Sequence, residues 1–147
     1  MVHADAAVML RELDDAAAVA SSWPVVRQLR PHLDEAALVA AWQRQRGEGY
    51  RAVAAFADDG RCLGFAGFRL QQMLAHGRFL YCDDLVTDAA CRGSGVGRRL
   101  LEWMLAEARR LGCASLQLDS GTQRSGAHAF YFGRGMQITS FHFSQPT

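Results

Sequence analysis

A glycine-rich segment in the second half of the chain has the residue types of an anion-binding loop. Glycine recurs at positions 93, 95 and 97, between two arginines and directly before an apolar-periodic helix. Because glycine has no Cβ, backbone N–H groups in such a segment can turn toward a bound anion and approach it closely. The positive end of the helix dipole and the guanidinium groups attract the same guest, so the segment predicts a diphosphate site. Its residues are Arg92, Gly93, Ser94, Gly95, Val96, Gly97 and Arg98.

Two familiar phosphate-binding motifs do not fit this segment. A P-loop requires Lys-Ser or Lys-Thr after its last glycine, whereas Arg98-Arg99 stands there. A dinucleotide-binding fingerprint spaces its glycines as Gly-x-Gly-x-x-Gly, and an acidic residue such as Asp119 follows roughly 20 residues later. The alternate glycines and the short chain argue against that fold. A tight turn without a ligand is the remaining alternative.

The elements around the loop follow from hydrophobic periodicity and from turn and cap signals. Asp14 is expected to cap a first, alanine-rich helix, which Trp23-Pro24 interrupts, and Asp34 is expected to cap a second helix. Asp59-Gly60 is a strong hairpin signal. The predicted strands are residues 8–13, 51–57, 62–70, 79–87, 115–119 and 138–143, and the clearest predicted helices are residues 35–46, 96–111 and 125–134.

This order of elements predicts an α+β (mixed α/β) fold on one central sheet, with an antiparallel meander in the middle of the chain. The chain has 147 residues, which is room for one domain. No repeat, linker or low-complexity tract interrupts it. Residues 1–147 are therefore expected to form a single domain.

Composition narrows the classes of partner. The net charge of +1 argues against general binding to nucleic acid or to an anionic membrane, since either favours a basic excess. No apolar run approaches the ~20 residues that span a bilayer, and the first residues have no secretory pattern, so a cytoplasmic location is expected. The 4 cysteines and 5 histidines are scattered, which favours reduced thiols and no metal site.

Several of these motifs together resemble the GNAT superfamily of N-acetyltransferases, which bind acetyl-coenzyme A (acetyl-CoA). The segment Arg92–Gly97 matches the family signature Arg/Gln-x-x-Gly-x-Gly/Ala, and Ala127, Phe130-Tyr131 and Gly135-Met136 follow at the family's spacing. The layout of strands and helices is similar over nearly the whole chain. The resemblance implies a mostly antiparallel twisted sheet, splayed at the cofactor cleft and flanked by helices, and an acetyl-CoA-dependent N-acetyltransferase.

The resemblance also implies roles for the cofactor-binding residues. The backbone of Leu85, Val86 and Thr87 would pair with the pantetheine arm as an added strand and offer an N–H to the acetyl carbonyl. The loop from Arg92 to Arg98 would wrap the pyrophosphate. The sequence departs from the family pattern at Arg124, where many members have Asn.

Acetyl transfer to an amine needs a proton donor and a way to obtain the neutral amine. The resemblance assigns the donor to Tyr131, because a phenol of pKa ~10 is protonated at neutral pH. Asp83 and Asp84 are candidate bases or substrate anchors, and adjacent strand residues point to opposite faces, so only one is expected to face the cleft. Asp84 is favoured because it shares a face with Val86. Deprotonation by water alone stays open.

The acceptor is predicted only as an amine of a small molecule or a protein. By analogy with the family, its pocket would form from Trp23–Glu48 and from the turn Gln71–Arg78, and the candidate lining residues are Trp23, Trp42, Tyr50 and Phe68. Homodimers are common among such folds, but no sequence feature argues for one here. The alternative function is a non-catalytic acyl-CoA-binding sensor or regulatory module.

Overall fold

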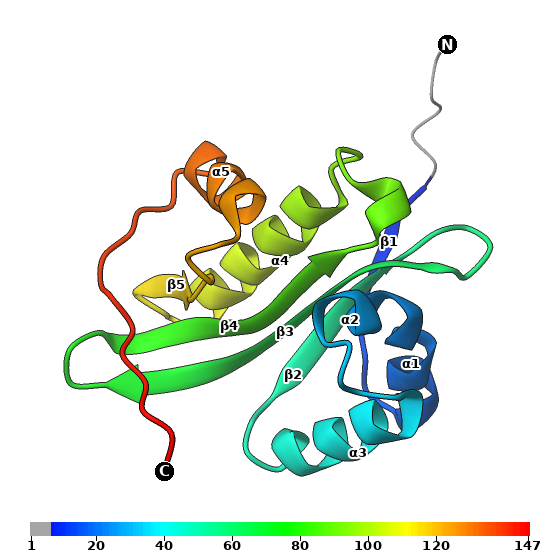
Figure 1. Ribbon diagram of the computed structural model, residues 1–147, viewed down its shortest axis with the longest axis horizontal. Coiled ribbons are helices and arrows are strands. Elements are labelled where there is room, and N and C mark those ends of the chain that lie inside the picture. Colours follow the sequence, from blue (N-terminus) through cyan, green and yellow to red (C-terminus); the bar gives the residue numbers. More distant parts are fainter. Residues whose placement is uncertain (1–6) are drawn as a thin grey trace. The chain divides into compact units, whose positions relative to one another are not determined.

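The computed structural model describes residues 7–147, which divide into two compact units, residues 7–117 and residues 118–147 (Figure 1). The expectation of a single domain stays a prediction. The first unit contains β1 (Met9–Glu12), α1 (Ala16–Ser21), α2 (Trp23–Leu29), α3 (Glu35–Arg46), β2 (Arg51–Phe56), β3 (Cys62–Met73), β4 (Gly77–Thr87), the 3-10 helix η1 (Ala89–Cys91), α4 (Val96–Arg110) and the first residues of β5 (Ser115–Leu118).

A five-stranded sheet with the order β1-β2-β3-β4-β5 is the framework of the fold. Strands β1 to β4 pair antiparallel with their neighbours, which confirms the predicted α+β class and the central meander. Asp59 begins the β2–β3 turn by accepting a hydrogen bond from the Arg61 N–H at 2.9 Å, and Gly60 adopts φ 85°. Because most elements are signalled by local patterns, their bounds lie within a few residues of those predicted.

Helices cover both faces of the sheet in the first unit (Figure 1). Helices α1 to α3 pack on one face, where Leu38 and Trp42 meet Phe65 of β3 in a buried apolar cluster. Helix α4 covers the other face, where Trp103 contacts Phe68 with ring centroids 5.6 Å apart. Within the described residues, no helix is long and apolar enough to cross a bilayer.

The amino-terminal helices begin at acidic caps, as the sequence indicates, but one cap is shifted. Asp34 caps α3 by accepting from the Ala37 N–H at 2.7 Å. Asp14 was expected to cap α1, and this is wrong, because Asp15 accepts the corresponding hydrogen bond from the Ala18 N–H at 2.7 Å. Either aspartate fits the local pattern, and the extended backbone of Asp15 decides between them.

Strand β4 contains a bulge that the sequence pattern does not reveal. Gly67 of β3 lies opposite Asp84, whereas the next residue, Phe68, lies opposite Cys82. Asp83 is therefore an extra residue on β4, and the bulge changes the alternation of side chains at this point.

The second unit contains the end of β5, helix α5 (Ser125–Gly133) and an irregular carboxyl-terminal segment. The strand expected over Ile138–Phe143 does not form, which corrects the prediction. Ile138, Phe141 and Phe143 are 69%, 83% and 91% exposed. The polar pair 139–140 breaks the alternation, so Ile138 and Phe141 would point to opposite faces of a strand. The pattern therefore supplies no continuous apolar face.

Gly64 sets how closely α4 approaches the sheet, and we predict that Gly64→Ala destabilises the fold. A Cβ at this position would lie 2.6 Å from Val96 Cγ1, 2.9 Å from Leu100 Cδ1 and 3.3 Å from the Val86 carbonyl oxygen. Overpacking of this kind costs about 1–3 kcal/mol. Urea unfolding measures the loss. Gly133→Ala is the control, because nothing lies within 4 Å of its added Cβ, and equal stability of the two variants would contradict the prediction.

Candidate functional site

The amino end of α4 is open in the manner expected of an anion site. Gly93 and Gly95 adopt φ angles of 82° and 89°, which only glycine tolerates readily, and they turn the chain into the helix. No side chain caps the helix. The hydroxyl of Ser94, the residue before the cap position Gly95, donates instead to the Cys91 carbonyl oxygen. The first-turn N–H groups are therefore available to a ligand.

The three arginines beside the loop differ in the hydrogen bonds and ion pairs that they make within the chain. Arg92 is exposed, and Arg98 is also exposed, with its Nε 3.7 Å from Glu102 Oε1. An ion pair this long and exposed yields easily to another anion. Arg99 donates to the Val8 carbonyl oxygen at 2.8 Å, so its guanidinium is tied to the chain's first strand region. Two of the three arginines near the loop are thus suited to hold phosphate oxygens.

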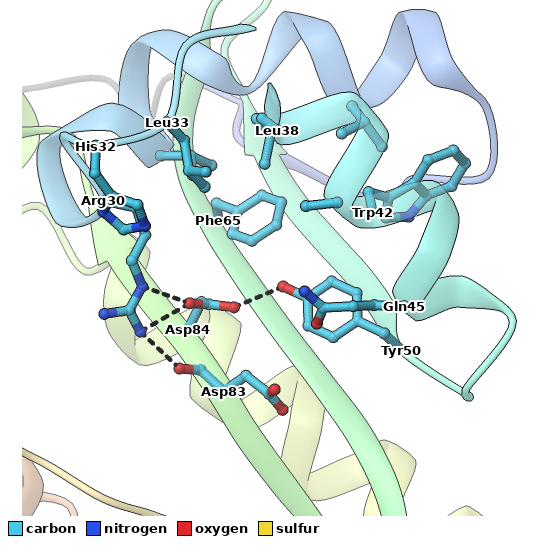
Figure 2. Close-up of a pocket in the computed structure, with 13 residues that line it drawn as sticks. Arg30, His32, Leu33, Leu38, Trp42, Gln45, Tyr50, Phe65, Asp83 and Asp84 are labelled. Atoms are coloured by element: carbon cyan, nitrogen blue, oxygen red, sulfur yellow. Dashed lines mark hydrogen bonds and ion pairs between the residues drawn. The ribbon is translucent and has the colours of Figure 1, made fainter. Parts of the chain in front are cut away.

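The strand that leads into this loop also forms one wall of a cavity. Leu85, Val86 and Thr87 pair with Ala66, Phe65 and Gly64 of β3, so the predicted pantetheine-binding segment is held in a regular ladder. The cavity lies on the face covered by α1 to α3 and has a volume of about 280 Å³ (Figure 2). It is lined by Val19, Val26, Arg30, His32, Leu33, Leu38, Ala41, Trp42, Gln45, Tyr50, Phe65, Asp83 and Asp84.

Asp84 has hydrogen-bond partners on two sides in this cavity. Its Oδ1 accepts from Arg30 Nε at 2.9 Å, and its Oδ2 accepts from the Tyr50 hydroxyl at 2.7 Å (Figure 2). Burial, and the charge and hydrogen bond of Asp84, raise the pKa of Tyr50 well above its ordinary value. Tyr50 therefore keeps its proton and acts as a donor at neutral pH. Asp84 is fixed from two sides while its side chain stays 19% exposed.

Asp83 is paired with a second guanidinium on the same face. Arg69 donates to Asp83 through Nε and, at 2.7 Å, through Nη2, and it also donates to Gln45 Oε1 of α3 at 2.8 Å. Burial raises the pKa of Asp83, and the hydrogen bond from Arg69 opposes part of that rise. The expectation that only one of the two aspartates faces the cleft is wrong, because the bulge turns both toward the α1–α3 face. Asp84 does share that face with Val86.

Gly67 allows this arrangement by leaving room for Tyr50. A Cβ on Gly67 would lie 1.6 Å from the Tyr50 hydroxyl oxygen and 2.4 Å from Cζ. Gly67 lies directly opposite Asp84 in the strand register. The Tyr50 ring can pass over β3 and reach the Asp84 carboxylate only because position 67 has no side chain.

Tyr131, the predicted proton donor, lies in α5 of the second unit. Its ring packs edge-on to Phe130 with centroids 5.5 Å apart. In the same unit, His128 Nε2 lies 2.8 Å from the Gly121 carbonyl oxygen, and His142 Nδ1 lies 3.6 Å from Asp119. The role of Tyr131 stays a prediction.

Two of the four cysteines, Cys62 and Cys82, offer little nucleophilic character. Burial raises the pKa of Cys62 to about 11 and that of Cys82 on β4 to about 12. Both are therefore thiols at neutral pH. No group of three or more potential metal ligands occurs among residues 7–147.

Comparison with known proteins identifies the family. The model of the acetyltransferase (GNAT) family matches residues 12–136, which is most of the chain. The chain belongs to the GNAT acetyltransferase family. A curated relative from Bacillus subtilis, described as the uncharacterized N-acetyltransferase YhdJ, is 31% identical over 141 residues, covering 95% of this chain and 99% of the relative.

Solved structures share the GNAT fold with this chain. A Trypanosoma brucei acetyltransferase has a TM-score of 0.78 and 23% identity, covering 96% of this chain and 100% of its own. An aminoglycoside N-acetyltransferase in complex with CoA has a TM-score of 0.85 and 15% identity, and the match covers 100% of this chain and 99% of that protein. Proteins of this family use acetyl-CoA and act on amine acceptors.

Sequence analysis did not find all the residues that form the cavity and hold its aspartates. Arg30 and Arg69, which hold the two aspartates, gave no local signal, because their partners lie 54 and 14 residues away in sequence. Trp42 and Tyr50 were candidates and do line the cavity, whereas the turn Gln71–Arg78 contributes no residue to it. Phe68, another candidate, faces α4 on the opposite side of the sheet.

We predict that Gly67→Ala and Tyr50→Phe are coupled in stability. Each removes or displaces the donor that satisfies Asp84, and a buried polar group left without its partner costs about 1–3 kcal/mol. The added methyl overlaps the hydroxyl most closely. Gly67→Ala should therefore cost less when residue 50 is already Phe. Urea unfolding of the four proteins of the double-mutant cycle measures this, and additive costs would refute it.

Proposed function

We propose that this chain transfers the acetyl group of acetyl-CoA to a primary amine by direct attack of the amine on the thioester. The observation that carries the proposal is the uncapped amino end of α4, flanked by Arg92 and Arg98, in a chain of the GNAT family. A diphosphate fits this end because N–H groups, the helix dipole and guanidinium groups act together there.

The order of residues along β4 supports the same proposal. Asp83 and Asp84 line the cavity, and Leu85 to Thr87 follow them directly and lead toward the loop. With the pantetheine arm along Leu85–Thr87, the acetyl group would reach the cavity beside Asp84. A backbone N–H of this segment would stabilise the negative charge that develops on the acetyl oxygen.

Acetyl transfer to an amine requires protons to leave the amine and a proton to reach the thiolate. A free alkylamine has a pKa near ~10.4 and must lose a proton before it attacks. We assign Asp84 to orient the amine, as a hydrogen-bond acceptor that its bonds to Arg30 and Tyr50 hold in place. The amine's protons leave to water. Tyr131 would donate a proton to the departing thiolate as the C–S bond breaks and the N–C bond forms, and it would regain a proton from water before the next turnover.

A covalent acetyl-cysteine step is not part of the proposal. Cys82 is the cysteine nearest the cavity carboxylates along β4, and its pKa of about 12 leaves almost no thiolate at neutral pH. Direct transfer to the amine needs no such nucleophile.

We predict that Arg92→Ala and Arg98→Ala each weaken CoA binding. Each removes a charge-assisted hydrogen bond to phosphate, which corresponds to about tenfold or more in dissociation constant. Isothermal titration calorimetry with CoA measures the change. Arg109→Ala removes the same charge from the opposite end of α4 and is the control. CoA affinity that is unchanged in both loop variants would remove the phosphate-loop assignment.

We predict that Tyr131→Phe lowers the rate of thiol release from acetyl-CoA by about 100-fold while acetyl-CoA binding is retained, because general-acid catalysis contributes about that factor. A thiol-reactive dye follows the reaction with a panel of primary amines. A variant that turns over at the wild-type rate would refute the assignment of Tyr131. Acetyl-CoA binding by the unmodified chain without thiol release for any amine would favour the acyl-CoA-binding sensor.

A further inference from the structure

The cavity on the α1–α3 face is electrically balanced by the protein itself. Each of its two carboxylates is paired with one guanidinium: Asp84 with Arg30 at 2.9 Å, and Asp83 with Arg69 at 2.7 Å. Three of these four side chains are about one-fifth exposed, and Arg30 is 40% exposed. The remaining titratable group besides Tyr50 is His32, at the rim. The cavity therefore offers no uncompensated negative charge.

One side of the cavity is apolar. Figure 2 shows Leu33, Leu38 and Phe65 together in the upper part of the view, while Asp84, Tyr50 and Gln45 lie together below them. The volume of about 280 Å³ is near the lower end of small-molecule sites, which span ~300–1,000 Å³. A ligand of this cavity is therefore small, with one polar end and an apolar body. The apolar lining residues are Val19, Val26, Leu33, Leu38, Ala41, Trp42 and Phe65.

We propose that the acceptor is a small monoamine with an aryl or branched-alkyl body, an inference that rests on the proposed transferase function. Its nitrogen lies beside Asp84, next to the Leu85–Thr87 segment, and its body lies against Phe65 and Leu38. Polyamines and aminoglycosides are excluded as preferred acceptors. Each further ammonium group would need a carboxylate, and both carboxylates of the cavity already have guanidinium partners.

The same balance favours the reactive form of the amine. Transfer into an apolar, charge-balanced cavity disfavours an ammonium ion and lowers the pKa of the bound amine. A monoamine becomes neutral when it loses one proton on entering the cavity. A polycation that loses one proton still has charges that the cavity cannot compensate. Selectivity for monoamines and activation of the nucleophile therefore have one physical cause.

A competition between amine classes tests the inference. The full chain is supplied with acetyl-CoA and with 2-phenylethylamine, isoamylamine, spermidine or kanamycin, and thiol release gives kcat/KM for each. We expect the two monoamines to exceed spermidine and kanamycin by at least about tenfold, the scale of one uncompensated charge at a partly exposed site. Equal or greater kcat/KM for either polycation overturns the inference.

Arg30→Gln tests the charge argument directly. It leaves Asp84 without its guanidinium, so the ratio of kcat/KM for spermidine to that for 2-phenylethylamine should rise about tenfold. Arg44→Gln is the control, because Arg44 is an exposed arginine of α3 that does not line the cavity, and it should leave the ratio unchanged. An unchanged ratio in Arg30→Gln overturns the inference.

A second variant keeps the test decisive if Arg30→Gln does not fold. Ala41→Leu adds bulk to the cavity wall and should lower kcat/KM for 2-phenylethylamine more than for methylamine, whereas Ala36→Leu adds the same bulk to an exposed position of α3. Equal losses for both amines in Ala41→Leu overturn the inference. Turnover that is fastest with polycations overturns the acceptor class and leaves the transferase proposal standing. Acetyl-CoA binding without turnover of any amine overturns both.

Discussion

The bulge at Asp83 is the constraint on which the cavity depends. By adding one residue to β4, it brings two consecutive carboxylates to one face of the sheet, where alternation would have separated them. Two carboxylates on a partly buried face are costly unless cations compensate them. Arg30 and Arg69 supply that compensation, and Tyr50 supplies a further hydrogen bond.

Strand β4 also joins this cavity to the anion site. The chain runs from the cavity carboxylates through Leu85–Thr87 to the loop before α4, within the first unit. Two glycines of β3 make room for neighbouring side chains, one at each end of this segment and on opposite faces of the sheet. Gly67 admits the Tyr50 ring beside Asp84, and Gly64 admits Val96 at the start of α4. Both positions use the absence of a Cβ to bring a neighbour close to the backbone.

Sequence analysis succeeds here where structure is encoded locally. The Asp34 cap, the Asp59-Gly60 turn and the glycines before α4 each specify backbone geometry within a few residues, so the elements they bound are found where expected. The bulge has no such signal, because it depends on the register between two strands. The Arg30–Asp84 pair joins residues 54 positions apart and follows from the docking of α2 on the sheet. Local patterning also failed at 138–143, where apolar residues are present but do not share one face.

The pairing of both aspartates bears on reactivity as well as on stability. A cavity with free carboxylates would hold an amine as its ammonium ion, raise the amine's pKa and so oppose the attack that acetyl transfer requires. In this cavity the carboxylates are already satisfied by guanidinium groups, and the opposite side is apolar. Asp84 can still accept a hydrogen bond from a neutral amine, because a carboxylate oxygen has more than one acceptor site. The arginines that neutralise the aspartates therefore suit the cavity to a neutral nucleophile. The same ion pairs that allow two acids to be partly buried also prepare the site for an uncharged amine.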